Sequence, residues 1–160
     1  MKKTKVLSIS AVIIAVYVVV MYFTQSFAFA AYQIRIATSL YSLSYFSPFL
    51  ILPLGFANFL SNLLFGGLGI TDMLGGALAG IITSGGVYLV KKFRLPDLFV
   101  IPVIIFGPGL TVPIWLSYIL HVPYFTLAVS LCIGQIVPAV VGYILIKIFS
   151  KMEIEKLWNR

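Results

Sequence analysis

The chain has 160 residues, of which 61% are hydrophobic and 9% are charged, and its formal net charge is +7. No soluble domain of this size can bury so much apolar surface, and the apolar runs are continuous rather than alternating, which disfavours a β-barrel. The basic residues flank apolar segments, as in cytoplasmic loops, and so do not indicate nucleic-acid binding. We expect one multi-pass, all-α membrane domain over residues 1–160 in the cell membrane.

Six segments are expected to form its helices. Five are long and apolar, at 6–29, 48–65, 72–90, 97–120 and 123–149, and a sixth at 33–47 is short and rich in serine and tyrosine. The first follows a basic N-terminus and so imitates a signal peptide. It exceeds the usual signal core of about 7–15 residues, so we expect it to be retained as a span.

Charge placement decides whether the short segment crosses the bilayer. The basic N-terminus and the basic cluster at 91–94 should both be cytoplasmic, which requires an even number of crossings between them. Three long spans precede this cluster, so the short segment supplies the fourth crossing. Two more spans then return the basic C-terminus to the cytoplasm. We therefore predict a compact bundle of six transmembrane helices with both termini cytoplasmic. The alternative with the same parity has four spans, with residues 31–66 forming a re-entrant hairpin.

The first two segments carry a small-residue pair and a charge. Ala11 and Ala15 are four residues apart on the first, a spacing that permits close approach of another helix. Arg35 is one of only two charged residues between Lys5 and Lys91. An ionisable group at membrane depth is costly and usually faces a cavity, a partner or the interface. Beside Gln33, Arg35 could bind a flat ligand rich in acceptors, or it could extend to lipid headgroups.

The third and fourth segments add further polar groups. Asn58 and Asn62 share one helical face, where they could join helices or line a polar cavity. Thr71 or Asp72 could cap the helix that begins there, and Asp72 could also accept hydrogen bonds from a ligand or pair with Arg35. A Gly-x-x-x-Gly pair at 76 and 80 predicts close helix packing.

The last two segments contain no charged residue between Asp97 and Lys147, and Gln135 is an isolated amide that must find a partner. The single histidine, His121, and the single cysteine, Cys132, exclude a two-histidine metal site and an intrachain disulfide. No acid is placed to form a catalytic triad, and no phosphate-binding glycine loop is present. We expect neither an enzyme nor a bound metal or cofactor.

Taken together, these features resemble the substrate-binding S component of an energy-coupling factor (ECF) transporter of the QueT, or queuosine-precursor, type. The motifs that carry the resemblance are the Ala-x-x-x-Ala pair, Q-I-R-I at 33–36, L-G-F-A-N-F-L at 54–60 and G-I-T-D-M-L-G-G-A-L-A at 69–79. The resemblance implies an outward-facing pocket for a small vitamin- or nucleobase-like molecule, closed by the loop after the first helix. It also implies a transmembrane coupling protein, which docks at Ala11 and Ala15, and two ATPase subunits that use the ATP.

The same resemblance implies a deazaguanine ligand and a set of binding residues. The candidate substrate-binding residues are Gln33, Arg35, Thr38, Asn58, Asp72 and Gln135. Thr38 and Gln135 stand where the family pattern commonly has glutamates. Loss of both acids disfavours a cationic aminomethyl ligand, so we predict a neutral ligand or another base. A stand-alone small transporter or channel, and a structural membrane subunit without a ligand, are the alternatives.

Overall fold

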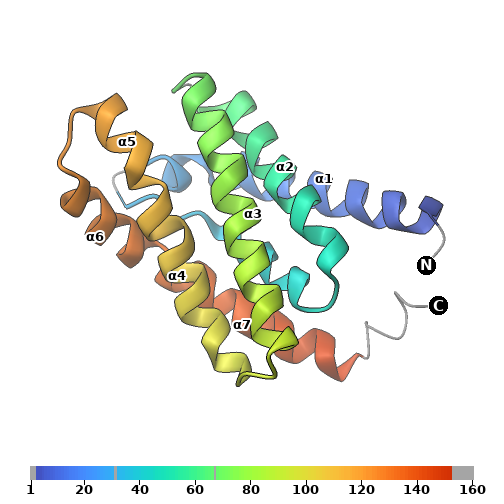
Figure 1. The fold of residues 1–160 in the computed structure, drawn as a ribbon. Helices are drawn as coiled ribbons and strands as arrows, with labels where there is room; N and C mark the ends of the chain where they lie inside the picture. The colour runs from blue at the N-terminus through green and yellow to red at the C-terminus, as the bar shows by residue number, and fades with distance from the viewer. Residues whose placement is uncertain (1–2, 31, 67, 153–160) are drawn as a thin grey trace.

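The computed structural model describes residues 3–30, 32–66 and 68–152, and in these ranges it is helical with no strand. Figure 1 shows the arrangement of the main helices, with α3 crossing the view between α2 and α4. The elements are α1 (Lys3–Ala28), η1 (Ile36–Tyr45), η2 (Pro48–Leu50), α2 (Ile51–Ser61), η3 (Asn62–Gly66), α3 (Ile70–Lys92), η4 (Asp97–Phe99), α4 (Val100–Thr111), α5 (Pro113–Leu120), α6 (Tyr124–Gly134) and α7 (Ile136–Lys151). The all-α fold predicted from the sequence is confirmed.

Five segments are long and apolar enough to cross a bilayer. They are Lys3–Ala28, Pro48–Gly66, Ile70–Lys92, Asp97–Leu120 and Tyr124–Lys151. Their bounds lie within a few residues of the five long spans expected from the sequence. Large apolar side chains cover their outer surfaces, including Phe23 at 77% exposed and Phe125 at 81% exposed. Such a surface suits lipid rather than water. The cytoplasmic placement of both termini stays a prediction.

The sixth segment, η1, is a 3₁₀ helix of ten residues in the interior of the bundle. At about 2 Å rise per residue it covers about 20 Å, roughly two thirds of the hydrocarbon thickness, where an α-helix of equal length would cover about 15 Å. It packs against α1, α3 and α7, and most of its residues are buried. Ser44 Oγ, for example, lies 2.7 Å from the carbonyl oxygen of Ser84 on α3. Because Thr38, Ser39, Ser42 and Ser44 are all buried inside the protein, this polar segment does not face lipid.

The last two spans are each divided into two helices by proline. Pro113 begins α5 directly after Val112, and Pro138 lies in the first turn of α7. Proline has no backbone N–H, so Pro138 cannot bond the carbonyl of Gly134, four residues earlier, where α6 ends. The break leaves Gln135 between α6 and α7, at the position where the loop after α1 approaches.

Close packing of α2 on α3 depends on glycine. A Cβ added to Gly80 would lie 3.0 Å from Gly55 Cα and 3.2 Å from Tyr41 Oη. A Cβ on Gly76 would overlap the side-chain amide of Asn62. The sequence prediction that the 76/80 pair marks a helix contact is therefore confirmed.

Polar side chains join η1, η4 and α7 at one end of the bundle. Asp97 accepts a hydrogen bond from Tyr45 Oη at 2.6 Å and forms an ion pair with Lys147 Nζ at 2.6 Å. Lys91 lies over the ring of Tyr45, 5.4 Å from its centroid. These contacts place the basic end of α3 beside the basic end of α7. In Figure 1, α1 begins and α7 ends on the same side of the molecule.

Candidate functional site

A cavity of about 430 Å³ lies at the other end of the bundle. It is enclosed by the segment after α1, the turn before α3, the turn between α5 and α6, and the first turns of α6. Its lining residues are Phe29, Ala30, Gln33, Gly66, Leu68, Leu120, Val122, Thr126, Leu127 and Ser130. The volume falls within the range of small-molecule sites, about 300–1,000 Å³. None of these described lining residues carries a charged side chain.

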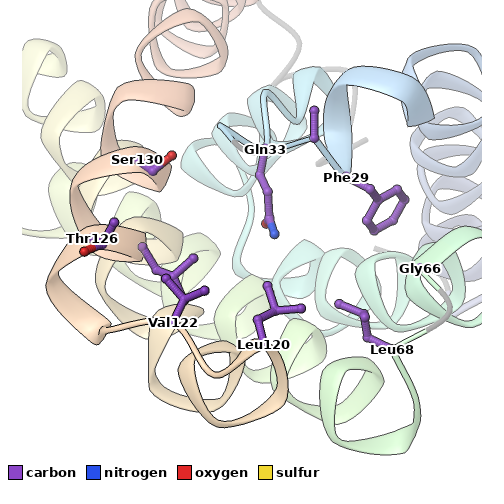
Figure 2. Close-up of a pocket in the computed structure, with 10 residues that line it drawn as sticks. Phe29, Gln33, Gly66, Leu68, Leu120, Val122, Thr126 and Ser130 are labelled. Carbon is purple, nitrogen blue, oxygen red and sulfur yellow. The ribbon is translucent and has the colours of Figure 1, made fainter.

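Gln33 supplies an amide to this cavity. Figure 2 shows its side chain reaching into the space, with Phe29 and Leu68 on one side and Thr126 and Ser130 on the other. The Gln33 backbone has a φ of +45°, a conformation that non-glycine residues adopt at some cost. Such strain persists only where surrounding contacts hold the chain in place.

Those contacts come from the break between α6 and α7. Gly134 packs directly against the backbone of Tyr32, where an added Cβ would overlap the carbonyl oxygen. Gln135 Nε2 donates a hydrogen bond to the carbonyl oxygen of Gln33 at 3.3 Å. The helix break therefore holds the loop that carries Gln33 against the cavity.

Thr38 and Gln135, 97 residues apart in the sequence, meet in the interior. Thr38 Oγ1 lies 2.7 Å from Gln135 Oε1 and 2.7 Å from the carbonyl oxygen of Arg35, so its single proton serves two acceptors. Both side chains are 1% exposed, and neither lines the 430 Å³ cavity. The pair fixes the loop after α1 to the last span.

Arg35 lies inside the protein and not at the lipid headgroups, since only 5% of the residue is exposed. Its Nη1 donates to Asn58 Oδ1 at 3.2 Å, and its Nη2 donates to Asn62 Oδ1. The guanidinium carbon lies 5.0 Å from the centroid of the Phe29 ring, within range of a cation–π contact. Its third nitrogen, Nε, is buried without a hydrogen-bond partner in the described parts of the chain. Because an unpaired buried donor is costly, this nitrogen is a candidate contact for a ligand acceptor.

Asp72 is the acid of the same network, and 6% of it is exposed. Its Oδ1 accepts a hydrogen bond from Trp115 Nε1 at 3.1 Å, and its backbone oxygen accepts one from Asn62 Nδ2 at 3.0 Å. Asn62 thus links Arg35 to Asp72. The suggestion that Thr71 or Asp72 caps α3 is not met: the N-cap is Gly69, with no side-chain cap bond.

A small gap of about 10 Å³ separates these charged groups. Arg35, Asp72, Asn62 and Trp115 line it, and it shares Phe29, Gln33 and Leu68 with the larger cavity. The gap has room for about one water molecule. The arrangement is a neutral, mostly apolar chamber with one polar edge that carries both signs of charge.

Asn58 contacts Arg35 but does not itself line the gap. Its Nδ2 donates to Tyr41 Oη at 2.7 Å, and Tyr41 Oη lies 3.1 Å from Tyr17 Oη on α1. Both tyrosines are fully buried. Asn58 therefore orients Arg35 and lines neither of these two cavities.

Of the candidate residues, the structure brings Gln33, Arg35 and Asp72 to the cavities, and Asn58, Thr38 and Gln135 support them. Ala11 and Ala15 lie away from the site, on the exposed face of α1. The sequence reasoning missed Phe29 and Trp115, because aromatic residues are common in apolar spans, and it left the role of Asn62 open. Within the described residues, no group of three or more histidine, cysteine, aspartate or glutamate side chains could hold a metal ion.

Comparison with protein families agrees with this arrangement. A family model described as "QueT transporter" matches residues 7–151, which is most of the chain. Comparisons with curated proteins and with solved structures gave no match. A transporter family accounts for a multi-pass membrane protein with a small-molecule substrate, and it fits the prediction that the protein is not an enzyme. The resemblance seen in the sequence is confirmed, and the chain belongs to the QueT transporter family.

Proposed function

We propose that this protein is the substrate-binding S component of an ATP-driven ECF uptake transporter in the cell membrane. The observation that carries the proposal is the buried Arg35, which two asparagines hold in the small gap beside the 430 Å³ cavity with its Nε unpaired. A planar donor and a nearby carboxylate suit a ligand whose edge presents both an acceptor and a donor. A deazaguanine queuosine precursor, or a related neutral base, has such an edge.

The ligand's body and its edge meet different surroundings. The larger cavity offers apolar walls, formed by Phe29, Leu68 and Leu127 among others, which suit a flat ring system. The small gap offers the polar contacts, and Gln33 lies on the boundary between the two. We infer that the polar edge of the ligand lies at this gap, with its acceptor against Arg35 and its donor against Asp72.

The charge balance of the site favours a neutral ligand. Arg35 and Asp72 offset each other, and the larger cavity has no charged side chain. At positions 38 and 135, where the family pattern commonly has glutamates, this chain has a hydroxyl and an amide, Thr38 and Gln135, which are bonded to each other. A cationic group would lose its hydration in this site without gaining a carboxylate of its own.

The energy for transport would come from partner subunits, since the chain has no nucleotide-binding loop. Ala11 and Ala15 lie on the exposed face of α1, the least buried of the five long segments. Two small side chains one turn apart allow the helix of a coupling protein to approach closely. We propose that the coupling protein docks there and that two ATPase subunits act through it.

A ligand panel tests the binding function, with Gln33→Met as the informative variant. The purified protein should be stabilised against heat, in a saturable way, by a neutral or cyano-substituted deazaguanine, and less by the aminomethyl compound. Methionine keeps the length of the side chain but removes its amide, whose hydrogen bond is worth about 1 kcal/mol, so the affinity should fall about fivefold. The measurement is the thermal shift as a function of ligand concentration.

Ser117→Ala is the matched control, because it also removes a polar group near this end of the bundle but does not line either cavity. Its ligand response should equal that of the unchanged protein. If none of the deazaguanines gives a saturable thermal shift, that substrate class is excluded. A wide preference for the cationic compound would contradict the neutral-ligand proposal.

Replacement of Ala11 or Ala15 by leucine tests the docking face. Either change should weaken co-purification with the coupling protein severalfold, because leucine prevents close helix approach, and should leave the ligand-induced thermal shift unchanged. Assembly is measured by co-purification from membranes that contain all the subunits.

Val129→Leu, on the exposed surface of α6, adds bulk to a different lipid-facing helix and should not alter assembly. Unchanged assembly of both alanine variants would remove the docking assignment. Ligand uptake that persists in cells lacking the coupling and ATPase subunits would favour a stand-alone transporter.

A further inference from the structure

A second hollow lies at the opposite end of α3 from the ligand cavity. It is an open groove of about 470 Å³ between the last turns of α3 and the start of α4. Its lining residues are all apolar: Gly86, Leu89, Val90, Phe93, Leu95, Phe99, Pro102, Val103 and Phe106. Gly86 forms part of its floor, where a Cβ would lie 2.9 Å from Val103 Cγ1. The groove runs along the surface of two membrane-spanning segments.

An arginine in an unusual conformation stands at the mouth of this groove. The α3 helix ends with a Schellman arrangement, in which Leu95 N donates to Val90 O at 2.9 Å and Arg94 N donates to Lys91 O at 3.0 Å. Arg94 occupies the left-handed position of that motif, with a φ of +54°, where glycine is usual. Its neighbours Phe93 and Leu95 both line the groove.

Arg94 and Lys92 are available to bind an external anion, because the acid nearest to them in sequence is paired with other residues. Both are exposed, and neither side chain forms a hydrogen bond or ion pair in the described parts of the chain. Lys91 instead faces the rings of Tyr45 and Phe46. Asp97, the nearest acid in sequence, is bonded to Tyr45 and Lys147. The rim of the groove is therefore positive, while its interior is apolar.

We propose that this groove binds an anionic phospholipid, with an acyl chain between α3 and α4 and the phosphate at Lys92 and Arg94. Apolar grooves that open beside basic residues at a membrane surface match both parts of such a lipid. A protein helix would fill the apolar groove but would leave the two cations without a specific partner. This site is separate from the proposed substrate cavity, so the proposal does not depend on the ligand.

Native mass spectrometry of the full chain tests the proposal, using phosphatidylglycerol and phosphatidylcholine with identical acyl chains. The protein should retain one phosphatidylglycerol molecule at concentrations where it retains no phosphatidylcholine. Lys92→Ala and Arg94→Ala should each weaken that retention about fivefold. Lys151→Ala removes an exposed lysine from the end of α7 and should have no effect. Glycerol phosphate, which lacks acyl chains, should not compete.

Two further variants separate binding from folding. Arg94→Gly relieves the left-handed backbone, so its melting temperature should be at least that of the unchanged protein while lipid retention falls. Leu89→Trp should fill the groove and weaken retention with both cations intact. The proposal would be overturned if the protein retained the two lipids equally or if Arg94→Gly retained phosphatidylglycerol fully. It would also be overturned if Lys151→Ala lost as much retention as Lys92→Ala and Arg94→Ala, or if glycerol phosphate competed.

Discussion

Replacement of Arg35 by methionine is expected to lower the affinity for the ligand by about 100-fold, the largest loss of any single substitution in the site. A charge-assisted hydrogen bond in a buried site contributes about 1.5–3 kcal/mol, and the variant removes the donor that we place against the ligand. It also leaves Asn58 Oδ1 and Asn62 Oδ1 without their donor, at about 1–3 kcal/mol each. Both a ligand titration and the melting temperature of the ligand-free protein measure these effects.

Arg35→Lys separates the role of charge from that of geometry. Lysine keeps the positive charge beside Asp72 but cannot reach two asparagines and a ligand with one planar group. Its stability should lie between those of the unchanged protein and the methionine variant, and its ligand affinity should remain low. Normal affinity in either variant would show that the ligand does not contact Arg35.

Replacement of Gly134 by alanine is expected to have the largest effect on the loop that encloses the cavity. The added Cβ would overlap the Tyr32 carbonyl oxygen and lie 2.8 Å from its carbonyl carbon. Backbone atoms cannot move aside as easily as the end of a flexible side chain. The loss of folding free energy should therefore reach or exceed the roughly 1–3 kcal/mol that is usual for overpacking. The loop must move away, which displaces Gln33 and breaks the hydrogen bond from Gln135.

The expected readouts are a lower melting temperature, faster proteolysis within the loop after α1, and a ligand affinity lowered at least tenfold. Gly85→Ala is the matched control, because nothing lies within 4 Å of its added Cβ. In the middle of α3, that change should stabilise the helix by about 0.5–1 kcal/mol. A Gly134→Ala protein with normal stability and affinity would show that the loop does not need this contact.

Much of the site could be predicted because charge is so scarce in the membrane segments. Arg35 and Asp72 are the exceptions in an apolar background, and the high cost of burying a charge predicts that such residues face a cavity or a partner. The structure places both in one network through Asn62. That they bind a ligand stays a prediction, as do the roles of Thr38, Asn58 and Gln135.

The sequence by itself determined the class of fold, the five long spans, the scarce charges and the family. It did so because length, hydropathy and local motifs act over short stretches of chain. Only the tertiary structure decided that the short segment is a buried 3₁₀ helix, that Thr38 meets Gln135, and that Trp115 holds Asp72. Those outcomes depend on which surfaces of distant segments come together, and local sequence patterns do not predict such packing.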